Sequence, residues 1–183
     1  MAPPSAPTDN SEHRVAVDIS VSCQSWQSEL PAVRDICRKA IREAIHTAAR
    51  LSPTVQAEVS LVLSDDDFMQ GLNRQYRKID RPTNVLAFPG DDLGDTLDDL
   101  PEGISVAAPV LLGDVIVAFE TAVSEARADN KSLADHLSHL VVHGTLHLMG
   151  FDHENDADAQ EMESLETKVL AALGVGNPYN EGS

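Results

Sequence analysis

The chain has little cysteine and no long hydrophobic run. Its 183 residues include two cysteines, Cys23 and Cys37, which fall on separate predicted elements and lack the spacing of metal ligands. We therefore expect buried, reduced thiols rather than a disulfide. No apolar run approaches the roughly 18–20 residues of a membrane span, and residues 1–10 have neither the basic start nor the apolar segment of a signal peptide. These absences predict a cytoplasmic protein with no membrane partner.

Basic side chains are also scarce. The chain has 13 lysines and arginines against 30 aspartates and glutamates, a formal net charge of −17. This balance argues against broad, nonspecific attraction to nucleic acid, which normally comes with excess cationic residues, but it is compatible with a local basic patch. Many acidic residues lie between Asp91 and Glu102 and again from Asp152 to Glu166. We interpret most of them as a solvated loop and a solvated helix face.

The length and the hydrophobic content of 42% predict one domain with a sizeable core. Residues 1–12 are rich in proline, serine, aspartate and asparagine, and we expect a disordered tail there. The domain is predicted to span residues 13–176, and residues 177–183 are predicted to form a C-terminal tail.

Hydrophobic periodicity predicts strands mainly in the first part of the chain and helices in the last part. Expected strands cover residues 14–21, 57–63, 85–88 and 110–118, and the last, being the most apolar, is predicted to be central. Expected helices comprise one capped by Ser28 and running to about residue 48, then 64–76, 121–129, 133–149 and 157–173. Residues 90–108 are predicted to form a long loop. This order indicates an α+β domain in which helices pack against a small mixed β-sheet.

Three histidines stand at the spacing of a metal site. His143 and His147 are four residues apart, so on a helix they share one face and can bind one ion. At Gly150 the chain can leave the helix in a left-handed conformation, which brings His153 back beside His143 and His147. Three nitrogen ligands without an obvious fourth leave a position for water, as in catalytic zinc sites. One such histidine alone is usually a packed or surface residue, whereas three at this spacing favour a metal.

The same spacing occurs in metzincin proteases, whose second motif residue is a glutamate that acts as general base. Here that residue is Gly144. Glycine cannot accept a proton, so the pattern keeps the ligands of a metzincin-like site but lacks the group that peptide cleavage by that route requires.

A second constellation is cationic. The densest group of basic residues in this acidic chain comprises Arg74, Arg77, Lys78 and Arg81. Arginine can hold two oxygens of a phosphate and stays protonated while doing so. The alternative is a solvated helix end, where basic residues complement the helix dipole. The turn sequence that follows, Thr83-Asn84, could either fix the backbone or contact a substrate.

The two constellations together resemble the YbeY family of bacterial rRNA maturation endoribonucleases. The first matching segment reads Asn73-x-x-Tyr76-Arg77-x-x-Asp80-x-Pro82-Thr83-Asn84-Val85-Leu86-x-Phe88-Pro89, and a short second one reads Leu112-Gly113-Asp114-Val115. The third reads His139-Leu-Val-Val-His143-Gly144-x-Leu146-His147-Leu148-x-Gly150-Phe151-Asp152-His153. The resemblance extends from about residue 57 through the final helix.

The resemblance implies a zinc-dependent, single-strand-specific endoribonuclease that acts in small-subunit rRNA 3′ end processing, ribosome biogenesis and quality control. By this likeness His143, His147 and His153 hold one zinc ion, and Arg77 is the arginine needed for RNA cleavage. The implied partners are single-stranded rRNA, the small ribosomal subunit with its proteins, and an assembly GTPase. DNA is not an expected partner.

Two other interpretations stay open at this point. In the first, zinc is structural and the protein is a ribosome-assembly binding module, so that Arg77 is not needed for activity. In the second, the protein is a metal-dependent hydrolase of peptides or small molecules with Glu154 as the base. The sequence also leaves it open whether Asp152, His136 and His139 support the metal ligands or have only structural roles.

Overall fold

The computed structural model describes residues 15–51, 55–90, 109–153 and 155–179. Four strands and six helices follow one another in these ranges: β1 (Val15–Val21), α1 (Ser25–Glu29), α2 (Val33–Ala48), β2 (Ala57–Ser64), α3 (Asp66–Arg77), β3 (Val85–Pro89), β4 (Val110–Ala118), α4 (Phe119–Ala128), α5 (Leu133–Leu148) and α6 (Asp156–Ala172). The predicted tail at residues 1–12 and most of the predicted loop, including its acidic part, lie outside the described residues.

The strands form one mixed sheet in the order β1-β2-β4-β3. β1, β2 and β4 are parallel, and β3 runs antiparallel to β4 at the edge. Most of the β4 side chains are buried, which agrees with its continuous apolar sequence. The predicted mixed sheet, with the strand at residues 110–118 inside it, is confirmed.

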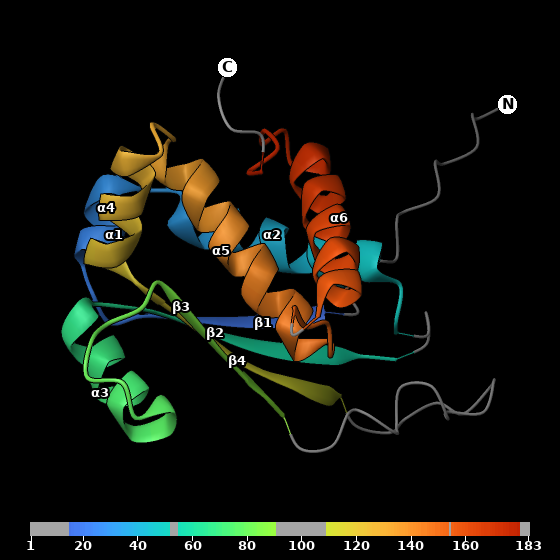
Figure 1. Cartoon of the computed structure of the whole chain (residues 1–183), viewed down its shortest axis with the longest axis horizontal. Coiled ribbons are helices and arrows are strands. Elements are labelled where there is room, and N and C mark those ends of the chain that lie inside the picture. Colours follow the sequence, from blue (N-terminus) through green and yellow to red (C-terminus); the bar gives the residue numbers. More distant parts are fainter. Residues whose placement is uncertain (1–14, 52–54, 91–108, 154, 180–183) are drawn as a thin grey trace, which may run out of the picture.

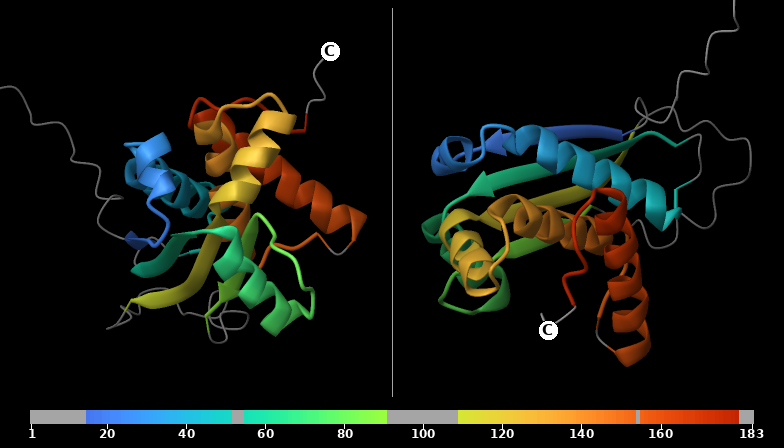
Figure 2. Two further views of the ribbon diagram at one scale, coloured as in Figure 1. Left: turned by 90° about the vertical axis from the view of Figure 1, so that its left-hand side faces the viewer. Right: turned by 90° about the horizontal axis from the view of Figure 1, so that it is seen from above.

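The helices cover the two faces of the sheet unequally. α2 and α5 pack against each other over one face, with α6 beside them, whereas α3 lies on the other face (Figures 1 and 2). The larger hydrophobic core lies between the sheet and the first group of helices. A smaller cluster on the α3 face consists of Met69, Leu86, Ile116 and Ala118. The α+β architecture is therefore as predicted.

The first helical region differs from the prediction. In place of one helix capped by Ser28, the structure has α1 and α2, with residues 30–32 between them. Pro31 stands in this break, where its missing backbone N–H would interrupt a continuous helix. Trp26 anchors α1, because it is completely buried and its Nε1 donates to the Ser64 carbonyl at 3.0 Å.

Side-chain caps begin the helices that carry the candidate site residues. The carboxylate of Asp65 accepts from the Phe68 N–H at the start of α3, and the hydroxyl of Ser132 accepts from the Asp135 N–H at the start of α5. Each cap satisfies a backbone donor that the helix itself leaves free. The short side chains therefore determine where these helices begin.

Both cysteines are buried and reduced, as predicted. Burial raises the pKa of the Cys37 thiol to about 12. No helix in the described ranges is long and apolar enough to cross a membrane.

Candidate metal centre

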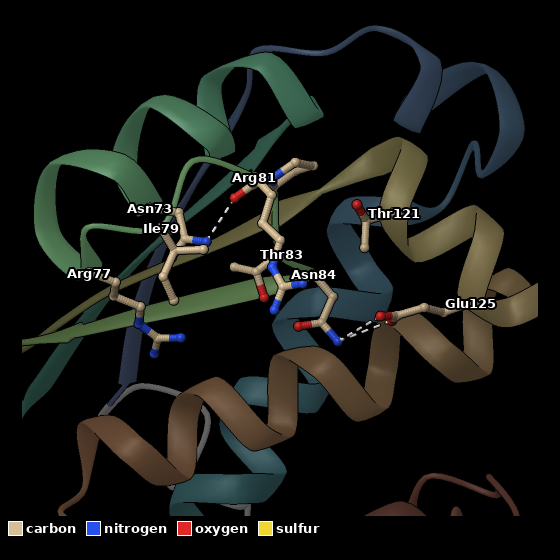
Figure 3. A pocket seen from close by; sticks show the side chains of 9 residues that line it. Asn73, Arg77, Ile79, Arg81, Thr83, Asn84, Thr121 and Glu125 are labelled. Carbon is tan, nitrogen blue, oxygen red and sulfur yellow. Dashed lines mark hydrogen bonds between the residues drawn. The ribbon is translucent and has the colours of Figure 1, made fainter.

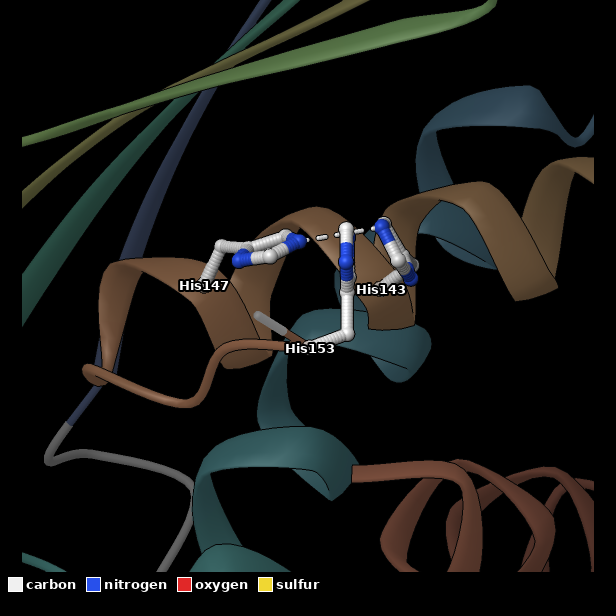
Figure 4. Close-up of side chains that lie close together, drawn as sticks. All are labelled: His143, His147 and His153. Atoms are coloured by element: carbon white, nitrogen blue, oxygen red, sulfur yellow. Dashed lines mark hydrogen bonds between the residues drawn. The ribbon is translucent and has the colours of Figure 1, made fainter. Parts of the chain in front are cut away.

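α5 presents His143 and His147 on one face, one turn apart (Figure 4). Their Nε2 atoms are 3.0 Å apart. Two nitrogens bound to one tetrahedral ion at about 2.0–2.1 Å lie roughly 3.3 Å apart. The helix alone thus places two imidazoles close to the separation that a shared ion requires.

The turn after α5 brings back the third histidine. Gly150 has a φ of 80°, as predicted, and the Phe151 N–H donates to the Leu146 carbonyl at 3.1 Å. The Asp152 carboxylate then accepts from the His153 backbone N–H at 2.7 Å. This contact favours the structural role for Asp152, but Asn155, not Asp152, caps the following helix.

The three histidines form a compact group of possible ligand atoms. One side-chain nitrogen from each of His143, His147 and His153 lies within 4.8 Å of the other two. Burial lowers the pKa of His147, and the neighbouring imidazoles lower it further. Since only a neutral imidazole can bind a metal ion, this environment favours the binding form. The donor set therefore fits a divalent ion that accepts nitrogen ligands.

Arg50 holds the turn in place from another element. Its guanidinium donates to the Met149 carbonyl at 3.1 Å and lies 3.6 Å from the centre of the Phe151 ring. The cation complements the carbonyl end of α5 and the face of the aromatic ring. Arg50 follows α2 and is 99 residues away from Met149, so no local pattern indicated this contact.

Glu166 on α6 orients His143, one of the three candidate ligands, from behind. Its side chain is fully buried, and its carboxylate accepts from Nδ1 of His143 at 2.7 Å. This bond places the proton of His143 on Nδ1 and leaves Nε2, the atom that faces His147, free to bind a metal. The sequence interpretation placed this residue in an acidic, solvated stretch, and for Glu166 that prediction is wrong.

Two more side chains hold the Glu166 carboxylate. Nε2 of His139 lies 3.2 Å from it, and the hydroxyl of Tyr179 donates to it. Burial by itself raises the pKa of Glu166, but the hydrogen bonds from His139, His143 and Tyr179 outweigh burial and hold this pKa at about 2. Glu166 is therefore a carboxylate at neutral pH. Of the two candidate supporting histidines, His139 contacts this group.

Gly144 packs against the sheet rather than facing the histidines. A Cβ atom added there would lie 2.7 Å from Cγ1 of Val115 and 3.3 Å from Cγ2 of Val85. A glutamate at this position would clash with the sheet. The geometry thus supports the inference from the sequence that a metzincin-type general base is not part of this site.

A separate cavity of about 320 Å³ lies between α3, the segment after it and α4 (Figure 3). Its lining residues are Asn73, Arg77, Ile79, Arg81, Pro82, Thr83, Asn84, Thr121 and Glu125. Two of the four cationic residues are occupied elsewhere, since Arg74 pairs with Asp80 at 3.7 Å and Lys78 donates to the Gln75 carbonyl. Arg77 and Arg81 are thus the members of the predicted cationic group that line the cavity.

One polar network closes the α4 side of the cavity. Asn84 donates to both carboxylate oxygens of Glu125 at 3.0 and 3.2 Å, while its own carbonyl oxygen accepts from the Val85 N–H at 2.7 Å. Glu125 also bonds Nε2 of His136 at 2.8 Å. Asn84 therefore both fixes the backbone and lines the cavity. His136 therefore contacts Glu125 in this network, whereas the carboxylate behind His143 is that of Glu166.

The sequence matches the family model described as Endoribonuclease YbeY over residues 20–174. This chain belongs to the YbeY endoribonuclease family. Membership makes it an enzyme of a class that hydrolyses RNA, and the resemblance stated from the sequence is confirmed.

Individual YbeY relatives match over nearly their whole length. Endoribonuclease YbeY of Paramagnetospirillum magneticum is 47% identical over 167 residues, which cover 91% of this chain and 97% of the relative. The protein of the same name from Azorhizobium caulinodans is 48% identical over 163 residues, covering 89% and 95%. A Thermotoga maritima protein solved in solution aligns with 22% identity and a TM-score of 0.46 over 90% of this chain and 99% of that one.

For this YbeY member, the predicted site residues separate into two groups in the structure. The three histidines lie together, and Arg77 lines a separate cavity. Glu154, the alternative base, lies outside the described residues. Sequence reasoning missed Glu166, Tyr179, Arg50 and Glu125, because each reaches its partner only through the tertiary fold. The one available signal was helical spacing, because residue 166 falls on the same face of α6 as the apolar Met162, Val169 and Leu170.

Proposed function

We propose that this chain is a zinc-dependent endoribonuclease that cleaves single-stranded rRNA during small-subunit 3′ end processing and quality control. The observation that carries the proposal is the grouping of three imidazole nitrogens within 4.8 Å in a member of an endoribonuclease family. Three nitrogen ligands and an open fourth position are the donor set of catalytic zinc.

His143, His147 and His153 would hold the ion, with Glu166 fixing the ring of His143. Zinc bound there would lower the pKa of a coordinated water and polarise a phosphoryl oxygen of the RNA. Arg77 would neutralise the negative charge that builds up on the phosphate during cleavage. Its guanidinium is free to do so, because it has no ion-pair or hydrogen-bond partner among the described residues.

The proposed partners follow from the substrate. Cleavage of rRNA in assembling ribosomes would bring the protein into contact with the small subunit and its proteins in the cytoplasm, and the family resemblance suggests an assembly GTPase as a further partner. DNA and membranes are not proposed as partners.

The test combines zinc content with cleavage of single-stranded rRNA fragments by wild type, His147→Ala and Arg77→Ala. We expect about one bound zinc in wild type, loss of that zinc in His147→Ala, and retained zinc without cleavage in Arg77→Ala. Arg74→Ala is the matched control, because Arg74 is on the same helix but pairs with Asp80, and it should cleave like wild type.

The alternative is a binding module with structural zinc. It predicts that zinc-loaded wild type leaves RNA intact and that Arg77→Ala supports ribosome assembly as well as wild type does. That pair of results would overturn the proposed activity.

A further inference from the structure

The cavity beside α3 presents unlike groups at its two ends. Arg77 lies at one end and Glu125 at the other, and Arg81 extends between them (Figure 3). Its volume of about 320 Å³ falls at the lower end of the range of small-molecule sites, roughly 300–1,000 Å³. A ligand of this size that fits both ends must be anionic at one end and donate hydrogen bonds at the other.

The anionic end is specified by Arg77 and Arg81. Neither guanidinium has a hydrogen-bond or ion-pair partner in the described part of the chain. In a protein with a net charge of −17, carboxylates were available in abundance to pair with them. Two unpaired arginines in one cavity match a phosphate group, which their planar forks can bind with two parallel hydrogen bonds each.

The other end presents hydrogen-bond acceptors. These acceptors are the carboxylate oxygens of Glu125, which lies opposite Arg77 (Figure 3). The two oxygens already accept from Asn84 and contact His136, and a carboxylate has lone pairs for further hydrogen bonds.

We propose that this cavity binds one nucleotide of the RNA and favours a base with an exocyclic amino group over uracil. The phosphate would lie on Arg77 and Arg81, and the amino group would donate to the carboxylate of Glu125. A carboxylate accepts from the amino group of cytosine but meets a carbonyl oxygen at the same position of uracil. This inference depends on the proposed function in one respect, which is that RNA supplies the ligand.

CMP and UMP are the matched probes, because they differ at the ring position that carries the amino or the keto group. We expect CMP to bind more tightly than UMP by roughly five- to tenfold and cytidine, which has no phosphate, to bind more weakly than CMP. Isothermal titration calorimetry measures the three affinities. Repeating it with His147→Ala, which removes a metal ligand, should leave CMP affinity unchanged, because the phosphate would not be bound by the metal.

Two variants separate the two ends of the cavity. Arg81→Ala should weaken CMP and UMP equally, by about tenfold, and leave their ratio unchanged; Arg127→Ala, an exposed arginine of α4 outside the cavity, is its control. Glu125→Gln should reduce or reverse the CMP preference, because the new amide can donate to uracil. If thermal unfolding shows that this variant is not folded, the wild-type CMP to UMP ratio and Arg81→Ala decide the matter.

Equal binding of CMP and UMP, or CMP affinity that Arg81→Ala leaves unchanged, would overturn the inference. The nucleotide titration and the cleavage assay can fail independently of each other. Active enzyme without a CMP preference contradicts the nucleotide cavity alone, and CMP preference in a protein that leaves RNA intact contradicts the proposed endoribonuclease activity alone.

Discussion

At the scale of single residues, Glu166 connects the candidate metal centre to the rest of the fold. Its buried carboxylate bonds His139, His143 and Tyr179, which come from α5 and from the segment after α6. A carboxylate behind a ligand imidazole fixes the ring orientation and raises the basicity of the metal-binding nitrogen. The strength of metal binding should therefore depend on a side chain that does not touch the metal.

Replacement of Glu166 by glutamine tests this dependence. Glu166→Gln keeps the size but places an amide donor against side chains that themselves donate. Loss of such a supporting partner typically weakens metal binding by about 10–100-fold, so we expect the zinc dissociation constant to rise by that factor. Competition with a chromogenic chelator measures this constant.

The matched control is Glu161→Gln, because Glu161 is exposed on the same helix. Its zinc affinity should equal that of wild type. Equal weakening in both variants would attribute the effect to helix charge and contradict a specific role for Glu166.

The thiol of Cys37 gives a second prediction for a single residue. Burial raises its pKa from 9.0 to about 12, and only the thiolate reacts with disulfide reagents. In a Cys23→Ser background, Cys37 should resist Ellman's reagent at pH 8 in the folded protein and react promptly in denaturant. Rapid labelling of the folded protein would contradict this burial.

The same shift in the Cys37 pKa affects stability. Because the folded state favours the neutral thiol, this group's contribution to stability is complete below pH 9 and falls as the pH rises toward 12.

At the scale of elements, α5 serves the core and the metal centre with different faces. Its histidines 143 and 147 face the site, while Gly144 packs against Val85 and Val115 of the sheet. The absence of a side chain at Gly144 lets the helix approach the strands closely. The position of the candidate metal ligands relative to the sheet thus depends on this glycine.

A pair of glycine substitutions tests the close approach. Gly144→Ala places a Cβ 2.7 Å from the Val115 side chain, and such overpacking should lower the free energy of unfolding by about 1–3 kcal/mol. Gly71→Ala on α3 meets no atom within 4 Å and should raise it by about 0.5–1 kcal/mol, because alanine favours helix. Urea denaturation measures both.

The double variant Gly144→Ala/Val115→Ala tests the steric explanation further. Removing the Val115 methyl groups should make the alanine at 144 better tolerated than it is beside valine. If Gly144→Ala costs the same in both backgrounds, contact with Val115 is not the cause.

At the scale of the whole molecule, one cavity of this acidic chain contains two arginines without a side-chain partner among the described residues. A net charge of −17 opposes nonspecific attraction to RNA, whereas Arg77 and Arg81 offer local attraction. Recognition should then depend on a few contacts rather than on a broad cationic surface.

Salt dependence of RNA binding tests this distribution. For single strands, the slope of log K against log salt concentration is about −0.7 per phosphate contact, so two arginine contacts predict a slope no steeper than about −1.4. Fluorescence anisotropy with a labelled single strand measures it, with Arg81→Ala expected to flatten the slope. A much steeper slope would show that another cationic surface binds the RNA.

Local signals predicted most elements and the grouping of the three histidines, but not the contacts between elements. Periodicity located the strands and most helices, while Pro31 divides a helix that was predicted to be continuous. The grouping of the three histidines was predictable since helical spacing and the conformation of Gly150 act over a few residues. Glu166 was not, because it is 23 residues from His143 and an acidic neighbourhood usually indicates solvent.

By itself, the sequence determined the α+β class, the three histidines on a helix and turn, and the free, reduced cysteines, since each depends on nearest-neighbour geometry or composition. Only the tertiary structure decided which carboxylate lies behind His143, which arginines line the cavity, and that Arg50 holds the turn. These depend on how α2, α4, α5 and α6 pack around the sheet. Packing brings together side chains far apart in the sequence, and burial gives their charges and hydrogen bonds a strength that exposed groups lack.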